Sequence, residues 1–271
     1  MIDTVVKIGS MALIRKQDND IDYNIISRIA GELAPGMVLV SSGATEIGRL
    51  DYLKRNSSEP QGDIEEIKAD FAAQGQTILM ENYRRFMSPE YSMRQLLVEH
   101  THFNDPDKRE HIRRFLLRSS EQRAIPIINY NDPVSYEENR KVEIASYRKN
   151  GHKIVECIDN DETAAVITVL INAPVLVILT SVEGIYREKD NPDTLVEEIS
   201  AKSAGELQEK IDEFMQCCHG ASRDGAGGAF AKLKYISEPA KAGTRVIIGH
   251  ARHRLHELLQ GTVKCTNVFI K

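Results

Sequence analysis

Tryptophan is absent from this chain of 271 residues, and the aromatic residues together make up only 6% of it. The four cysteines, Cys157, Cys217, Cys218 and Cys265, have a spacing that fits neither a disulfide framework nor a zinc motif. No apolar run approaches the roughly 20 residues that a membrane-spanning helix needs, and the first residues carry no secretion signal. These absences predict reduced thiols, no membrane partner and a cytoplasmic location.

The chain also lacks an excess of positive charge, since its formal net charge is -5 with 28% charged residues. Such a balance argues against a general nucleic-acid binder, although it leaves room for a locally positive pocket. The length suits one large domain or two small ones. Because no linker, repeat or low-complexity stretch divides the sequence, we expect a single domain over 1–271 with two lobes, about 1–170 and 171–271.

Short apolar runs alternate with segments whose apolar residues recur at helical spacing, which predicts strands and helices in turn. Strands are expected over residues 4–8, 37–40, 95–98, 125–128, 175–179, 245–248 and 267–270. Helices are expected over residues 21–33, 64–86 and 106–118, and further helices from residues 161 and 232. Short apolar strands between helices indicate an α/β fold, a three-layer αβα sandwich with a mainly parallel central sheet.

One segment departs from this rhythm. Two alternating runs, 142–147 and 153–157, flank the dipeptide Asn150-Gly151. Asn-Gly between alternating runs is typical of a β-hairpin, so we expect an inserted hairpin near 141–158. A hairpin outside the core serves as a cover or contact surface in some proteins and is a surface decoration in others.

A run of small residues, Gly225-Ala226-Gly227-Gly228, is followed one helical turn later by Lys232. Such a loop lets backbone N–H groups close on an anion, and the helix that follows adds partial positive charge. It is not a Walker A loop, because no Lys-Ser or Lys-Thr pair follows the last glycine. A flexible surface loop has the same composition, so the interpretation depends on the rest of the chain.

Polar residues gather where the expected strands end, which is the edge at which open α/β sheets bind ligands. These residues are Gly9, Ser10, Ser41, Ser42, Gly43, Ala44, Asn129, Tyr130, Asn131, Asp132, Thr180 and Ser181. Lys7 lies within an apolar strand, where an ammonium group costs free energy unless it meets an anion or solvent, which favours an anion-facing role. Helix capping explains one of the three residues Asp159, Asn160 and Asp161, but not all of them.

Taken together, these features resemble the amino acid kinase family, from Val5 to about Thr266. The resemblance rests on Val6-Lys7-Ile8-Gly9-Ser10, Val40-Ser41-Ser42-Gly43-Ala44 with Gly48-Arg49, Ala72-Ala73-Gln74-Gly75-Gln76, the segment 125–132 with Asp159-Asn160-Asp161, Leu179-Thr180 with Gly184-Ile185-Tyr186, and the loop before Lys232. The Ser-Gly-Ala block favours the glutamate kinase branch over kinases of acetylglutamate, carbamate or UMP. The resemblance implies the carbamate kinase-like fold of the family.

It also implies ATP-dependent phosphorylation of a carboxylate, with Mg²⁺ bridging the β- and γ-phosphates, as in the proline biosynthesis pathway. Phosphoryl transfer between two anions requires charge neutralisation and alignment. The implied catalytic residues are Lys7, Lys232 and Asp161, with the aspartate holding both lysines. The N-terminal lobe would bind the acceptor and the C-terminal lobe ATP, and the family implies a homo-oligomer, a dimer or tetramer.

The remaining roles implied by the resemblance divide between the two substrates. Asp132 would pair with the substrate ammonium and Ser42 and Asn160 with its carboxylates, next to Gly43 and Ala44. The ATP-binding set would be Lys7, Gly9, Ser10, Thr180, Ser181, Gly184, Tyr186, Gly225, Ala226, Gly227, Gly228 and Lys232, with backbone N–H groups of Gly9, Ser10 and Gly43 around the phosphoryl oxygens. No residue is expected to hold a metal directly.

Three departures from the family pattern keep alternatives open. Ser181 stands where the family has an aspartate, Tyr130 replaces an acidic residue, and the stretch between Asp132 and Asp159 is longer than usual. A kinase of another small acid is therefore one alternative. A catalytically silent binder of nucleotide or amino acid is the other, although a silent binder has no need of both lysines.

Overall fold

The structure is a computed structural model, and it describes residues 2–135, 137–148, 154–156, 159–188, 191–218 and 229–271. Its centre is an eight-stranded sheet in the described part of the chain. In spatial order the strands are β10 (Glu198–Ala201), β12 (Cys265–Ile270), β11 (Arg245–His250), β7 (Val175–Thr180), β1 (Thr4–Ile8), β4 (Met37–Ser41), β6 (Ala124–Tyr130) and β5 (Ser92–Val98). Neighbouring strands pair in parallel, except that β11 and β12 are antiparallel.

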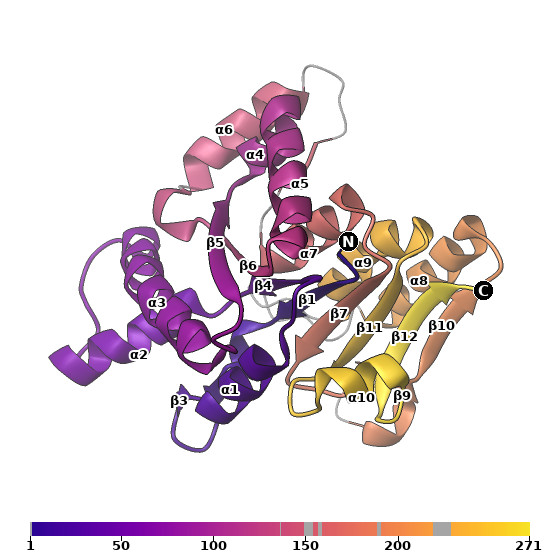
Figure 1. Cartoon of the computed structure of the whole chain (residues 1–271), viewed down its shortest axis with the longest axis horizontal. Helices are drawn as coiled ribbons and strands as arrows, with labels where there is room; N and C mark the ends of the chain where they lie inside the picture. Colours follow the sequence, from indigo (N-terminus) through magenta and orange to yellow (C-terminus); the bar gives the residue numbers. More distant parts are fainter. Residues whose placement is uncertain (1, 136, 149–153, 157–158, 189–190, 219–228) are drawn as a thin grey trace.

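Helices cover both faces of this sheet, as Figure 1 shows. One face packs against α4 (His100–Asn104), α5 (Pro106–Glu121), α7 (Asn160–Leu170), α8 (Ala204–Cys218) and α9 (Ala229–Lys241). The other face packs against α1 (Tyr23–Glu32), α2 (Ala44–Asn56), α3 (Ile64–Phe86) and α10 (Leu255–Gln260). This arrangement confirms the predicted three-layer sandwich with a mainly parallel sheet.

The apolar pattern of β1 explains its central position. Successive side chains of a strand point to opposite faces, and here Val5 belongs to one core cluster while Val6 belongs to the other. Both are fully buried. Lys7 is on the same side as Val5, so its ammonium group points toward the layer that contains α7.

The hairpin prediction near 141–158 is wrong for the described residues. Residues 142–147 belong to α6 (Glu137–Arg148), and residues 154–156 form no strand; the expected turn at 149–151 lies outside the described residues. Exposure shows why: Ile144 is 9% exposed but Val142 is 70% exposed, whereas a two-residue period places both on one face. The alternation extended over too few apolar residues to distinguish strand from helix.

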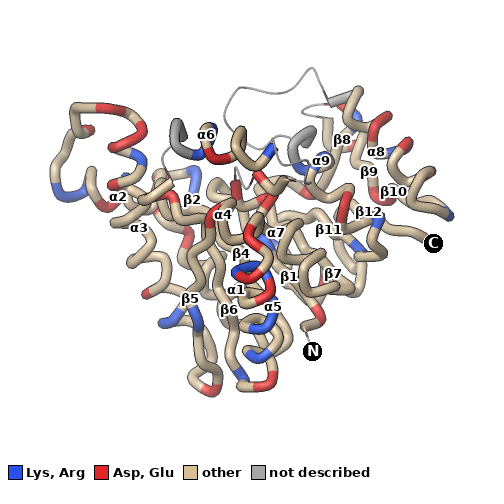
Figure 2. Tube along the Cα trace, turned by 90° about the horizontal axis from the view of Figure 1, so that it is seen from above, with Lys and Arg blue, Asp and Glu red and all other residues tan. Residues whose placement is uncertain are grey.

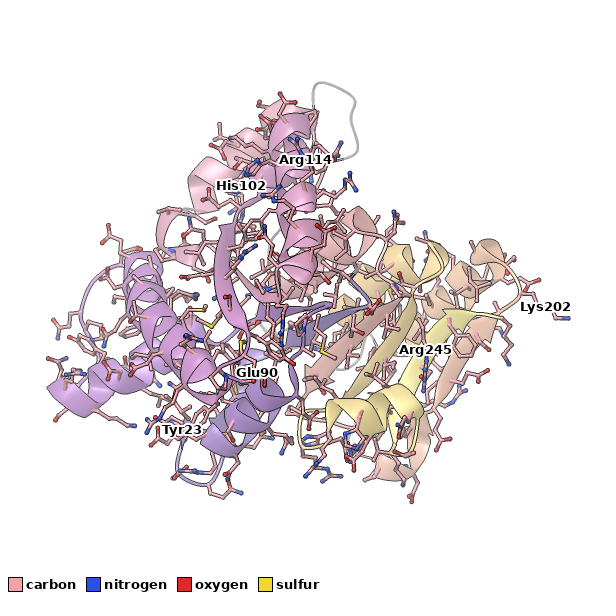
Figure 3. All side chains as sticks on the ribbon, viewed as in Figure 1. Tyr23, Glu90, His102, Arg114, Lys202 and Arg245 are labelled. Carbon is pink, nitrogen blue, oxygen red and sulfur yellow. The ribbon has the colours of Figure 1, made fainter. Side chains whose placement is uncertain are left out.

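The smaller elements lie around the ends of the sheet. β2 (Ile14–Arg15) pairs with β3 (Asp20–Ile21), and β8 (Ile185–Tyr186) pairs with β9 (Leu195–Val196). Short 3₁₀ helices span Ser10–Ala12, Asp132–Val134 and Pro192–Thr194. The α4, α5 and α6 helices extend from the β5 end of the sheet (Figure 1), and His102 and Arg114, labelled in Figure 3, belong to this part.

Two glycines bring α2 and α3 into backbone contact. A Cβ atom at Gly48 would lie 1.8 Å from the carbonyl oxygen of Phe71, and one at Gly75 would lie 1.8 Å from that of Ala44. Only glycine permits this approach. Because α2 starts directly after β4, the contact fixes the loop between them. Figure 2 shows that acidic and basic residues are interspersed along α2.

Among the described residues, no helix combines the length and the apolar character that crossing a bilayer requires.

Candidate active site

A buried ion pair lies at the centre of the carboxyl edge of the sheet. Lys7 Nζ on β1 lies 2.6 Å from Asp161 Oδ1 in the first turn of α7, and the two side chains are only 5% and 7% exposed. A buried charge is costly unless it is paired, so each group holds the other in place. The sequence prediction that Asp161 contacts Lys7 agrees with this geometry.

Lys232, on the first turns of α9, belongs to the same group of charges. Burial lowers the pKa of its ammonium group, the carboxylates of Asp161 and Asp159 oppose that change, and the Lys7 ammonium adds to it. The two lysines come from opposite ends of the chain and act electrostatically on one another. The two ammonium groups and the carboxylates of Asp161 and Asp159 form one cluster of charges, in which either lysine can also attract an anionic ligand.

The three residues that open α7 have three different contacts. Asp159 caps the helix, since its Oδ1 accepts hydrogen bonds from the N–H groups of Asp161 and Glu162, both at 2.9 Å. Burial raises the pKa of its carboxyl group. Asn160 Oδ1 accepts from Tyr130 N–H at 3.0 Å, and its Nδ2 donates to Asn129 Oδ1 at 2.7 Å. Capping thus explains Asp159 alone, as the sequence indicated.

The loops after β1 and β4 face one another beside the ion pair. Gly43 has φ +104°, and a Cβ atom on it would lie 2.9 Å from Leu13 Cδ1 and 3.8 Å from Ser10 Cα. A Cβ atom on Gly9 would lie 3.8 Å from Lys7 Nζ. Gly9 therefore places no side chain next to the lysine, and Gly43 allows the two loops to approach closely.

Backbone donors at these loops divide into two kinds. Gly9 N–H donates to the Leu179 carbonyl at 3.1 Å, so the expectation that it contacts a phosphoryl oxygen is not supported. Within the described part of the chain, the N–H groups of Ser10 and Gly43 have no hydrogen-bond partner. Ser42 N–H donates to the Ile8 carbonyl at 3.0 Å, and its side chain is half-buried. Ala44 is buried at the start of α2.

The residues expected to bind nucleotide lie after β7. Thr180 Oγ1 accepts from Val182 N–H at 2.9 Å, which forms a tight turn, and Ser181 is half-buried within that turn. At Gly184 a Cβ atom would lie 2.3 Å from Thr266 Oγ1, so packing alone requires glycine there. Tyr186 is half-buried on β8. Gly225, Ala226, Gly227 and Gly228 lie outside the described residues.

A second group of charges lies at the end of β6. Burial and the Glu46 carboxylate raise the pKa of Asp132 to about 6, while the Arg140 guanidinium on α6 acts in the opposite direction. Tyr130 OH lies 2.6 Å from Ser135 Oγ, which ties the start of the following loop to β6. Near neutral pH, the charge of the Asp132 carboxyl group therefore depends on the neighbouring charges of Glu46 and Arg140.

Sequence reasoning missed Glu46, Glu99 and Arg140. Glu99 Oε1 accepts a hydrogen bond from Asn131 Nδ2 at 2.9 Å, and Glu99 directly follows β5, so the rule that ligands bind beyond strand ends could have identified it. Glu46 follows the small residues after β4 by two positions. No sequence pattern pointed to Arg140, because the hairpin expected near 141–158 hid the helix to which it belongs.

The molecule is an αβα sandwich with lysine side chains at the carboxyl ends of its central strands. This arrangement is typical of α/β proteins that bind anionic ligands at that edge. The sequence model described as "Amino acid kinase family" matches residues 4–250. The chain belongs to the amino acid kinase family.

Curated relatives share the name glutamate 5-kinase. One from Nitrosospira multiformis is 30% identical over 258 residues, covering 92% of this chain and 62% of the relative. "Glutamate 5-kinase 2" of Bacillus subtilis is 31% identical, with coverages of 95% and 66%. One from Alkaliphilus metalliredigens is 29% identical, with coverages of 97% and 93%. The chain thus spans about two thirds of the first two relatives and nearly all of the third.

Solved structures with the same fold include an isopentenyl phosphate kinase substrate complex, with a TM-score of 0.53 and 17% identity over the full length of both chains. A product complex of the T. acidophilum isopentenyl phosphate kinase has a TM-score of 0.53 and 15% identity, covering 99% of this chain and all of that one. At such identities the likeness concerns the fold, and it agrees with the predicted kinase architecture.

Proposed function

We propose that the protein is an ATP-dependent kinase that phosphorylates the side-chain carboxylate of L-glutamate, giving L-glutamyl 5-phosphate for proline biosynthesis. The observation that carries this proposal is the group formed by Lys7, Asp161 and Lys232 at the carboxyl edge of the sheet. The names of the relatives support glutamate as the acceptor.

The chemistry follows from the charges. When bound, ATP supplies the γ-phosphoryl group, which an acceptor carboxylate oxygen takes as the bond to the β-phosphate oxygen breaks and ADP leaves. Lys7 and Lys232 neutralise the negative charge that the two anions bring together. Asp161 holds the Lys7 ammonium in position, since they are 2.6 Å apart. The N–H groups of Ser10 and Gly43 donate to phosphoryl oxygens.

The acceptor lies between β4 and β6 in this proposal. Asp132 pairs with its ammonium group, and Ser42 Oγ donates to a carboxylate. Asn160 contributes less than the resemblance implies, because Oδ1 and one of its two Nδ2 hydrogens already bond to the protein. Its main role is to position β6 against α7.

The nucleotide lies over the second half of the sheet, beside Thr180, Ser181, Gly184 and Tyr186 and the segment 225–228. The first lobe, about 1–170, then binds the acceptor and the second, about 171–271, binds ATP. Mg²⁺ held by ATP phosphates needs only one or two protein carboxylates. The described residues contain no ready-made cluster of three metal-binding side chains, and Asp159 and Asp161, which act on Lys232, are the carboxylates suited to assist.

A second candidate is a kinase that uses the same phosphoryl site with another small acid. Tyr130 in place of an acidic residue, and α6 in the lengthened stretch after Asp132, favour it. For both candidates we propose a cytoplasmic location and a homo-oligomeric state, of which the family resemblance implies the second.

An acceptor screen separates these candidates. ADP release is measured with Mg-ATP and L-glutamate, D-glutamate, L-aspartate, glutarate and N-acetylglutamate, and hydroxylamine traps any acyl phosphate as a hydroxamate. We expect the highest kcat/KM and a hydroxamate with L-glutamate. A higher kcat/KM with another acid supports the second candidate, and no turnover with any acid contradicts a carboxylate kinase.

A further inference from the structure

The α6 helix turns one of its faces toward the protein. Residues three and four positions apart share a helix face, so Arg140, Glu143 and Ile144 lie together. Ile144 is 9% exposed, and Glu143 Oε2 lies 2.8 Å from Nε2 of the buried His100. Val142, on the opposite side, is 70% exposed. Arg140 is half-buried on the face that is packed inward.

This face lies next to the carboxyl end of β6. The 3₁₀ helix Asp132–Val134 ends three residues before α6 begins. His100, which contacts Glu143, directly follows Glu99, which binds Asn131 at 2.9 Å. Two adjacent residues therefore connect α6 and the β6 loop, and they fix Arg140 relative to Asp132.

The charges at this edge act on one another, but no ion pair joins Arg140 to Asp132 or Glu46. The Asp132 carboxyl is pushed toward its neutral form by burial and by Glu46, and Arg140 opposes both. Arg140 nevertheless forms no ion pair or hydrogen bond with any described residue. Two carboxylates and a guanidinium thus remain available near one another, a pattern complementary to a molecule with an ammonium group and a carboxylate.

Three other donors near this edge already have a partner within the protein. Lys7 pairs with Asp161, Asn131 Nδ2 donates to Glu99, and Asn160 Nδ2 donates to Asn129. Arg140 differs from them, because none of the N–H donors of its guanidinium has an acceptor among the described residues. A guanidinium can bind a carboxylate through two parallel hydrogen bonds.

We propose that Arg140 binds the acceptor carboxylate that does not react, while Asp132 and Glu46 bind the acceptor ammonium, so that α6 selects an α-amino acid. This inference rests on the proposed function, because it assigns the α-carboxylate of the same acceptor. Arg140 is a specificity-determining residue here, and it takes no part in moving the phosphoryl group.

The test compares L-glutamate with 4-aminobutyrate, which has the same chain, ammonium group and reacting carboxylate but no α-carboxylate. The variants are Arg140→Gln and the matched control Arg148→Gln, on the same helix, where Arg148 pairs with Glu156. A charge-assisted pair contributes about 1.5–3 kcal/mol, or roughly 10- to 150-fold. We expect Arg140→Gln to raise KM for glutamate by that factor with kcat within about twofold, and to leave KM for 4-aminobutyrate unchanged.

Two outcomes overturn the proposal. One is an equal change in KM for both acceptors, which indicates a general disturbance of α6. The other is an unchanged KM for glutamate, or a change no larger than in Arg148→Gln. Calorimetric titration of L-glutamate into each protein is the second readout, with the same loss of affinity expected in Arg140→Gln. If the wild type binds glutamate through Arg140 but releases no ADP, the proposed function fails while this inference stands.

Discussion

Replacement of Asp161 by asparagine tests whether the buried ion pair is as important for the fold as its position indicates. The substitution preserves shape and removes one charge, leaving the Lys7 ammonium 5% exposed without its partner at 2.6 Å. Lys232 adds repulsion, because Lys7 and Lys232 already act unfavourably on one another. Removing one member of a buried pair costs about 3–5 kcal/mol. We therefore expect a loss of that size in the free energy of unfolding.

A surface pair supplies the control. Glu110 Oε2 lies 2.8 Å from Arg113 Nε, but these side chains are 46% and 40% exposed. Exposed pairs contribute about 0–1 kcal/mol, so Glu110→Gln is expected to change stability by no more than that. The double variant Lys7→Met/Asp161→Asn removes both buried charges, and we expect it to be more stable than Asp161→Asn alone.

Equilibrium unfolding in urea, followed by circular dichroism, measures all four proteins. The ranking expected for the free energy of unfolding is wild type and Glu110→Gln highest, then the double variant, then Asp161→Asn. If Asp161→Asn loses no more stability than Glu110→Gln, the charges of Lys7 and Asp161 do not compensate one another, and the buried pair is not needed for the fold.

Other predictions concern packing and pH. Gly75→Ala places a Cβ atom 1.8 Å from the Ala44 carbonyl oxygen and should lower the free energy of unfolding by about 3 kcal/mol. Gly205→Ala, in the first turn of α8, meets nothing within 4 Å and should raise the free energy of unfolding by no more than about 0.5–1 kcal/mol. Equal urea midpoints for the two variants would contradict the close contact of α2 and α3. The pKa of Asp132 is about 6 in the folded protein, against the ordinary value of 3.8. Ionisation of Asp132 therefore destabilises the folded state, and this destabilisation is absent below pH 3.8 and complete above pH 6. Asp132→Asn should therefore stabilise the protein by about 1–3 kcal/mol at pH 7 and by nothing at pH 3.5, at about 1.4 kcal/mol per pKa unit. The KM of the wild type for glutamate should rise as pH falls through 6, and a flat profile between pH 5 and 8 would remove Asp132 from ammonium binding.

The parts of the fold that the sequence predicted were those with strong periodic signals. The range expected for α3, 64–86, is the range observed, and β1, β7 and β11 begin at the expected residues, 4, 175 and 245. Buried parallel strands must be apolar on both faces, which makes them easy to identify. The site residues Lys7 and Asp161 were predicted to meet, and they do.

The missed elements had weaker or conflicting signals. The α2 helix contains Gly48, which disfavours a helix by propensity but is required by the contact with α3. The α8 helix is the exception, because the helical spacing of its fully buried residues Leu207 and Ile211 is visible in the sequence. For α6, the dipeptide Asn150-Gly151 favoured a hairpin, although Ile144 lies on the buried face of a helix. Arg140 and Glu46 depend on three segments meeting in space, which no local pattern records.

In the proposed mechanism, Lys7 and Lys232 act together on one transferring phosphoryl group. The most direct test is the kcat of Lys232→Met with Mg-ATP and L-glutamate, in protein whose urea unfolding matches the wild type. We expect kcat to fall by about 10²–10³-fold, as for loss of one donor that stabilises transition-state charge. A kcat equal to that of the wild type would contradict it.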